Sequence, residues 1–254
     1  MTFTLELAVQ DVAGARVARQ VGADSVELCA ALGSTGGLTP SPAMVQGCVE
    51  AGVATHVLIR PRPGPFVYDA DEVAVMVRDV SWAVALGATG VVIGALTSQH
   101  GVDLAVTSRL LAAAGPAIVT FHRAIDVAIA AGQAEAAVDQ LVALGLGRVL
   151  TSGGQARSLD GRPALAALAR QVDRRLAIIA GGGVRPADIA ALAATGVAGV
   201  HLSARAAATP AGLTGPGGGP AAIETTSRQI AAEAAAAVAA VASRPAGPAA
   251  GTSS

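Results

Sequence analysis

Short apolar runs alternate with amphipathic helical segments from one end of this chain to the other, and the alternation repeats eight times. The expected strands centre near Glu6, Glu27, Leu58, Val92, Thr120, Leu150, Ile178 and His201. Strands that are each followed by a helix pair in parallel through βαβ units. Glycines follow several of the helical segments, as in Val21-Gly22 and Leu86-Gly87, where they mark helix ends. The repetition predicts a closed (β/α)8 TIM barrel of the α/β class.

The helical segments between these strands are expected at 12–21, 43–51, 71–86, 104–113, 135–144, 164–172 and 187–194. The chain has 254 residues, about the length of one such barrel. We therefore expect the barrel over residues 1–208, followed by a Gly/Pro-rich linker over 209–222. A last helix over 223–242 would complete the barrel, and 243–254 would form a disordered tail.

The charge pattern excludes several classes of function. All 17 basic residues are arginine, so no lysine is present to form a Schiff base or to bind phosphate in a P-loop. A net charge of −1 favours neither nucleic acid nor an anionic membrane as a partner. The first residues lack the basic and apolar regions of a signal peptide, which predicts a cytoplasmic location. The oligomeric state stays open, a homo-oligomer included.

The expected barrel interior is unusually polar. Successive side chains along a strand point in turn to the barrel interior and to the helix layer, and we assign the apolar ones to the helix layer. This assignment directs a polar set into the lumen: Glu6, Glu27, His56, Arg60, His122 and His201. Such interiors are usually filled by Val, Ile and Leu, and buried charges are costly unless they are paired. Two interpretations follow, a structural ion-pair network in which the glutamates neutralise Arg60 and the histidines, or a ligand pocket.

Glycine clusters follow three of the expected strands, and they predict an anion site. Loops after the seventh and eighth strands commonly bind phosphate in this fold, because bare glycine amides can approach an anion closely. The alternative is that these glycines only permit tight turns. The expected anion-binding residues are Arg123, Ser152, Gly153, Gly154, Gly182, Gly183 and Ser203, with Arg60 across the rim.

Several strings along residues 5–205 resemble the copper homeostasis protein CutC family. They occur in the family's order: Val26–Cys29, Gly36–Ser41, Ile59–Arg62, Val92–Leu96, Thr120–Ala124 with Asp126, Val149–Gly154, Gly181–Pro186 and His201–Arg205. The resemblance implies a (β/α)8 barrel, a cytoplasmic location and a role tied to copper. It also implies a Cu(I) site made by two cysteines, one at the end of each of the first two strands.

One departure from the family pattern concerns that copper site. The family's first strand usually ends in Glu-Val-Cys-Val, whereas this chain has Glu6-Leu7-Ala8-Val9. Cys29 remains, but Ala8 stands where its partner would be. Cu(I) prefers soft sulfur ligands, so Cys29 alone is a weak candidate. Glu6, with Glu27 and a histidine, is a weak candidate ligand for another divalent metal.

Two functions therefore stay open at the level of the sequence. The first is copper binding in copper homeostasis, and the second is an enzyme or binder that takes a small phosphate- or carboxylate-bearing molecule in the barrel mouth. For the second, Glu27 or His122 would act as general base, and Arg60 or His201 as electrostatic stabiliser. Whether the site is catalytic at all is not decided by the sequence.

Overall fold

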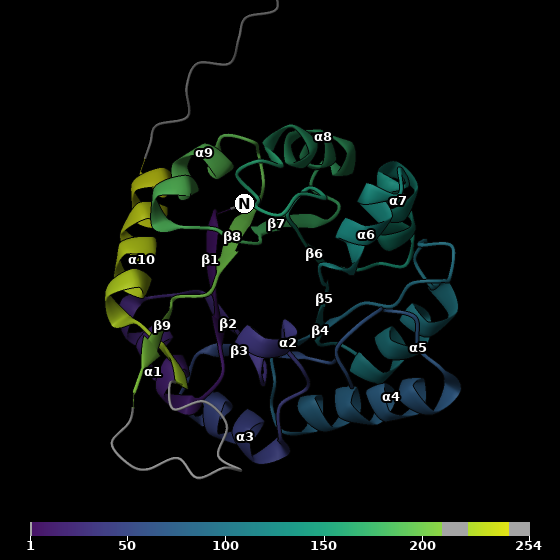
Figure 1. Ribbon diagram of the computed structural model, residues 1–254, viewed down its shortest axis with the longest axis horizontal. Coiled ribbons are helices and arrows are strands. Elements are labelled where there is room, and N and C mark those ends of the chain that lie inside the picture. Colours follow the sequence, from purple (N-terminus) through teal and green to yellow (C-terminus); the bar gives the residue numbers. More distant parts are fainter. Residues whose placement is uncertain (1, 210–222, 244–254) are drawn as a thin grey trace, which may run out of the picture.

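The computed structural model describes residues 2–209 and 223–243, and its centre is a closed barrel of eight parallel strands (Figure 1). Each strand pairs with the next in the chain, and β8 pairs with β1. The strands are β1 (Thr4–Val9), β2 (Ser25–Leu28), β3 (Ala54–Leu58), β4 (Gly90–Ile93), β5 (Ile118–Phe121), β6 (Arg148–Thr151), β7 (Ala177–Gly181) and β8 (Gly199–Leu202).

Helices surround the barrel as an outer ring (Figure 1). They are α1 (Val12–Val21), α3 (Pro42–Glu50), α4 (Ala70–Ala85), α5 (Leu104–Ala114), α6 (Ala124–Ala130), α7 (Ala134–Ala143), α8 (Arg162–Val172), α9 (Ile189–Ala193) and α10 (Arg228–Ala242), with a 3-10 turn, η1, at Pro186–Asp188. The short helix α2 (Leu32–Thr35) lies inside this ring, at the mouth of the barrel (Figure 1). The (β/α)8 class and all eight predicted strand positions are confirmed. Among the described residues, no helix is both long and apolar enough to cross a bilayer.

Local signals in the sequence explain where these helices begin and end. Asp11 caps α1 by accepting a hydrogen bond from the Gly14 amide at 2.6 Å. Gly22 ends α1 with φ at 78°, a left-handed conformation that favours glycine. Asp69 and Glu72 form a reciprocal capping box at the start of α4. The sequence prediction had no segment for α2 or α6, which are both shorter than eight residues.

The end of the chain differs from the prediction. Residues 223–226 do not begin a helix but form a strand, β10 (Ile223–Thr226), which pairs antiparallel with β9 (Arg205–Ala208). The β-branched residues of this segment favour a strand. The helix α10 begins only at Arg228, where the Ser227 hydroxyl accepts a hydrogen bond from the Ile230 amide. It then completes the ring between α9 and α1 (Figure 1).

The barrel divides its side chains between two environments. The main apolar core lies between strands and helices and includes Leu5, Leu7, Val26 and Phe121. A small inner apolar cluster comprises Cys29, Leu58 and Val92. The predicted linker over 209–222 and tail over 243–254 lie almost wholly outside the described residues.

Candidate functional site

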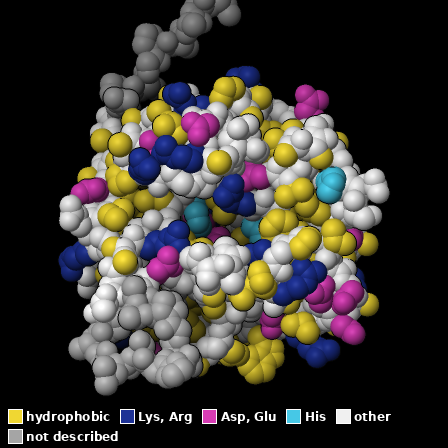
Figure 2. Space-filling view, in the orientation of Figure 1, with side chains coloured by type: hydrophobic (Ala, Val, Ile, Leu, Met, Phe, Trp, Pro, Cys, Tyr) yellow, Lys and Arg dark blue, Asp and Glu magenta, His cyan; other side chains and the backbone are white. Residues whose placement is uncertain are grey.

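A cavity of about 360 Å³ opens at the mouth of the barrel, where the strands end. Figure 2 shows this hollow with histidine and acidic side chains at its bottom and basic side chains around it. Its polar lining unites residues far apart in the chain: Glu27, Arg60, His122, Arg123, Gly182, Gly183, His201, Ser203 and Arg205. The structure thus brings all four candidate catalytic residues and four of the seven candidate anion-binding residues to one cavity.

Glu6 lies at the floor of the lumen, where it is 1% exposed and has four polar partners. Its Oε2 accepts hydrogen bonds from Ser25 Oγ at 2.8 Å and Arg148 Nη2 at 3.0 Å. The same oxygen lies 2.6 Å from His56 Nδ1, while Oε1 lies 3.1 Å from His201 Nδ1. Ladder register explains this convergence, since Glu6 stands opposite Ser25 on β2 and His201 on β8.

These partners determine the charge of Glu6. Burial alone would raise the pKa of Glu6, but hydrogen bonds from His201 and His56, together with the charge of Arg148, hold it well below its ordinary value. Glu6 is therefore a carboxylate at neutral pH. Burial by itself would lower the pKa of His201, yet the nearby carboxyl of Glu27 and the bond to Glu6 raise it overall.

Glu27 is the second buried carboxyl of the lumen, and its situation is different. It is 5% exposed, and its Oε2 has no hydrogen-bond partner among the described residues. Burial raises the pKa of Glu27, and repulsion from Glu6 adds to the effect of burial. One oxygen of Glu6, one of Glu27 and one ring nitrogen of His201 lie within 4.8 Å of one another. An unpartnered carboxyl beside a histidine is thus held against the cavity.

Arg60 follows β3 and joins two loops of the mouth. Its Nη1 donates to the carbonyls of Thr35 at 2.8 Å and Gly37 at 3.1 Å, and its Nη2 donates to Gly64 O at 3.0 Å. The guanidinium lies over the ring of Phe66, 5.1 Å from its centroid. In the described part of the chain, Arg60 forms no ion pair, and its Nε is unpartnered. The sequence alternative in which Arg60 pairs with Glu6 or Glu27 is therefore wrong.

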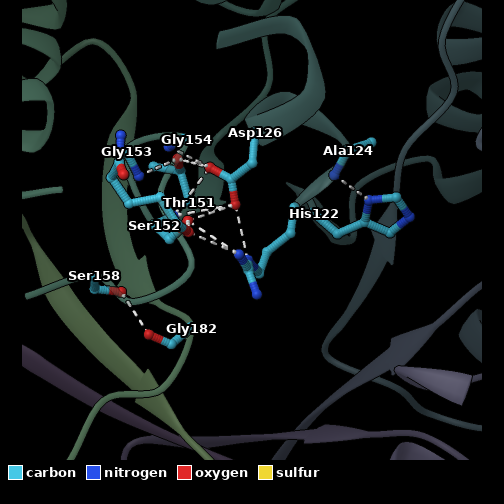
Figure 3. Close-up of polar contacts among 11 residues, drawn as sticks. His122, Ala124, Asp126, Thr151, Ser152, Gly153, Gly154, Ser158 and Gly182 are labelled. Atoms are coloured by element: carbon cyan, nitrogen blue, oxygen red, sulfur yellow. Dashed lines mark hydrogen bonds and ion pairs between the residues drawn. The ribbon is translucent and has the colours of Figure 1, made fainter. Parts of the chain in front are cut away.

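His122 follows β5 and is a neutral donor at the mouth, where its ring packs against Phe66 with centroids 4.8 Å apart. The Ala124 amide donates to His122 Nδ1 at 3.1 Å (Figure 3), so the proton of the neutral ring lies on Nε2. Burial, together with the positive charge of Arg60, lowers the pKa of His122 to about 3. His122 Nε2 is buried and has no partner within residues 2–209 and 223–243. At neutral pH this ring offers a hydrogen bond rather than a charge.

The loop after β6 is organised by Asp126, one turn into the helix after His122 (Figure 3). Asp126 accepts hydrogen bonds from the amides of Ser152 at 3.0 Å and Gly154 at 3.1 Å. The Gly153 amide donates to Thr151 Oγ1 at 2.9 Å. Three of the donors expected to bind an anion are therefore already occupied by the chain itself. Arg123 contacts the same loop, since its Nε donates to Asp126 Oδ2 at 2.8 Å and its Nη2 donates to Ser152 Oγ at 3.0 Å.

The loop after β7 is different, because its glycine amides are free. Gly182 and Gly183 have positive φ values of 118° and 60°. Their amides donate no hydrogen bond to any described residue, although the Gly182 carbonyl accepts one from the Ser158 amide. Ser203, after β8, adds a buried hydroxyl without a partner among residues that the structure describes. These donors lie on the two loops from which the sequence predicted anion binding.

Arg148 and the role of Asp126 were not predicted from the sequence. Arg148, the first residue of β6, shares the inward parity of Leu150 and could have been found by the alternation used for the other strands. Asp126 belongs to one of the strings that resemble the family, but its role could not be predicted, because its partners lie on a loop 25–28 residues further along the chain.

A polar-mouthed (β/α)8 barrel is the class that this fold and cavity define, and comparison with known proteins gives the family. The CutC family profile matches residues 3–206. A CutC family protein of Pasteurella multocida is 39% identical over 181 residues, which cover 71% of this chain and 72% of the relative. One from Xanthomonas campestris is 47% identical over 183 residues, covering 71% and 74%.

A solved structure agrees with these relatives. The crystal structure of the protein named CutC from Streptococcus agalactiae, whose name associates it with copper homeostasis, superposes with a TM-score of 0.73 at 31% identity. The superposition covers 80% of this chain and 99% of that one. A thiamine phosphate pyrophosphorylase from Pyrococcus furiosus, at 15% identity and a TM-score of 0.57, shares the fold alone. The chain belongs to the CutC family, whose name refers to copper homeostasis.

Proposed function

We propose that the mouth cavity binds a small organic anion, a metabolite that carries a phosphate or carboxylate group. The observation that carries this proposal is the isolated charge of Arg60. Arg60 is 8% exposed and borders the cavity, and its guanidinium contacts carbonyls but no carboxylate within the described residues. A buried charge without a counter-ion is costly. A bound anion would supply the missing negative charge.

Neutral donors surround the place where that anion would lie. The free amides of Gly182 and Gly183, the Ser203 hydroxyl and the His122 Nε2–H all belong to the lining of the same cavity. Arg123 is 43% exposed at the rim, where its bond to Asp126 holds it beside Gly182. Charge from one side and amide donors from the other suit a phosphate or carboxylate. A volume of about 360 Å³ falls within the range of small-molecule pockets.

The proposal is tested by titrating inorganic phosphate into the wild type, Arg60→Ala and Arg62→Ala. Arg62 is the matched control, because it also binds loop carbonyls and lies over an aromatic ring, Tyr68, but it pairs with Glu72 and does not line the cavity. Phosphate should raise the Tm of the wild type and of Arg62→Ala. Calorimetry should show that Arg60→Ala weakens binding by about 1.5–3 kcal/mol, the range for hydrogen bonds to charged groups.

Both variants are expected to have a lower Tm without phosphate, since each loses the hydrogen bonds that its guanidinium donates to loop carbonyls. Only the phosphate-dependent shift therefore reports on the site. A lowered Tm in Arg60→Ala, with no response to phosphate in any of the three proteins, would leave Arg60 as a structural residue and refute the proposal.

Copper binding is the second candidate, and the family name favours it. The residues of this chain do not suit Cu(I), because Ala8 offers no ligand and Cys29 is a fully buried thiol whose Sγ lies 3.8 Å from Val9 O. Burial and the nearby Glu27 raise the pKa of Cys29, which disfavours the thiolate that a metal requires. A divalent ion at Glu6, Glu27 and His201 is disfavoured as well, because Glu6 already binds the guanidinium of Arg148.

We therefore expect weak Cu(I) binding that depends on Cys29. Competition against a Cu(I) chelator should show loss of this binding in Cys29→Ser. Tight stoichiometric binding that persists in Cys29→Ser would show that the chain holds copper elsewhere. We propose a cytoplasmic location for either function, since Cys29 and Cys48 are both free buried thiols.

A further inference from the structure

The floor of the cavity holds two groups suited to proton transfer, and the proposed anion site does not use them. His201 is fixed by Glu6, which occupies its Nδ1 at 3.1 Å, so Nε2 is the ring nitrogen left for a ligand. Glu27 presents an unpartnered carboxyl oxygen beside it. Both side chains line the cavity. Asp- or Glu-fixed histidines and desolvated carboxyls are typical of acid–base catalysis.

Glu27 and His201 lie close enough for the pair to share one proton. The groups that face it are Glu6 on β1, His56 on β3 and Arg148 on β6. Glu6 and Arg148 neutralise each other through their ion pair at 3.0 Å. The pair can then exist as a carboxylate with an imidazolium or as a carboxylic acid with a neutral imidazole. The two forms differ only in which residue carries the proton.

We propose that Glu27 and His201 catalyse proton transfer at a carbon next to a carbonyl group, in a small α-hydroxycarbonyl substrate that carries a phosphate or carboxylate. This inference rests on the proposed function, because the anion site would hold the substrate over the pair. The reaction class is a 1,2-isomerisation through an enediol. It needs neither an oxidant nor a lysine, and this chain has no lysine.

Glu27 and His201 supply and recover every proton that moves in this reaction. The Glu27 carboxylate takes the proton from the carbon, the C–H electron pair forms the C=C bond, and the carbonyl π pair moves to oxygen. That oxygen takes the proton of His201 Nε2, which leaves a neutral enediol, a protonated Glu27 and a neutral His201. Glu27 then gives its proton to the neighbouring carbon, which was the carbonyl carbon. His201 accepts the proton of the hydroxyl on the first carbon, which becomes the new carbonyl. The His122 Nε2–H is a neutral donor that can hydrogen-bond the substrate from across the cavity.

The experiment uses dihydroxyacetone phosphate and hydroxypyruvate as probes, since each joins an anionic group to a hydroxymethyl ketone. Proton NMR in D2O follows the loss of the hydroxymethyl C–H signal with the wild type, Glu27→Gln, His201→Asn and His100→Asn. His100 is an exposed loop histidine outside the cavity and is the matched control. Inorganic phosphate affinity is measured for all four proteins by calorimetry.

We expect the wild type and His100→Asn to exchange at least one probe about 100-fold faster than Glu27→Gln or His201→Asn, the lower end of general acid–base contributions. The phosphate affinity of all four should agree within about threefold. Phosphate binding by the wild type, with exchange no faster than in Glu27→Gln for both probes, would overturn the inference and leave the anion site standing. Failure of the wild type to bind phosphate or either probe would refute the proposed function and this inference with it.

Discussion

Glu6 and Glu27 are two buried glutamates of one barrel lumen, on neighbouring strands, and their surroundings give them opposite properties. Glu6 is bonded by Ser25, His56, Arg148 and His201, and its pKa lies well below the ordinary value. Glu27 has an unpartnered oxygen among the described residues, and its pKa is raised. The difference teaches that burial alone does not define a role. A carboxylate whose oxygens are hydrogen-bonded within the protein stabilises the fold, whereas a carboxyl with an unpartnered oxygen is available to a ligand.

The largest expected effect is on stability in Glu6→Gln. Removing this carboxylate leaves the Arg148 guanidinium, whose side chain is 15% exposed, without its counter-charge, and breaking a buried pair typically costs about 3–5 kcal/mol. Urea denaturation at neutral pH should show that loss in the free energy of unfolding. Glu27→Gln should change the same quantity by about 1 kcal/mol or less, because no ion pair is broken.

A double-mutant cycle tests the cause of that loss. Arg148→Met alone should destabilise the protein. The double variant Glu6→Gln/Arg148→Met should lose about 0.5–3 kcal/mol less free energy of unfolding than the sum of the two single losses. Additive losses, or equal losses in Glu6→Gln and Glu27→Gln, would contradict the distinction between the two carboxyls.

A smaller effect is expected in the pH dependence of stability. The folded pKa of Glu27 is raised above 4.5, so its contribution is fully present below that pH and is lost as pH rises through the folded pKa. Glu6 behaves in the opposite sense, since its depressed pKa contributes stability above pH 4.5 that is lost as pH falls. Urea denaturation between pH 4 and 8 should show the wild type losing stability relative to Glu27→Gln as pH rises. Parallel curves for the two proteins would argue against a raised pKa.

Much of this fold could be predicted because the barrel repeats one local signal. Alternation along each strand separates Leu5 and Leu7, in the helix layer, from Glu6 in the lumen. The strand β10 was mistaken for helix because α10 follows it closely and its own signal is only four residues long. Local pattern carries little information where an element is that short.

The site was predicted less completely, since its connections depend on tertiary contacts. Parity placed Glu27, His122 and His201 at the cavity, but it could not show that His201 is bound to Glu6 while Glu27 Oε2 lacks a described partner. The glycine loops after β6 and β7 read alike in sequence. Only the structure shows that Asp126 occupies the amides of the first and leaves those of the second free.

The most direct test of this account is a carbon-13 NMR titration of the glutamate side-chain carboxyls, with the resonances of Glu6 and Glu27 assigned from Glu6→Gln and Glu27→Gln. We expect Glu27 to titrate above pH 4.5 and its resonance to shift when inorganic phosphate is added. Glu6 should stay ionised to the lowest pH at which the protein remains folded, and its resonance should not respond to phosphate. Titration of both carboxyls near pH 4.5, with no response of Glu27 to phosphate, would contradict the division of the lumen into a structural and a ligand-facing carboxyl.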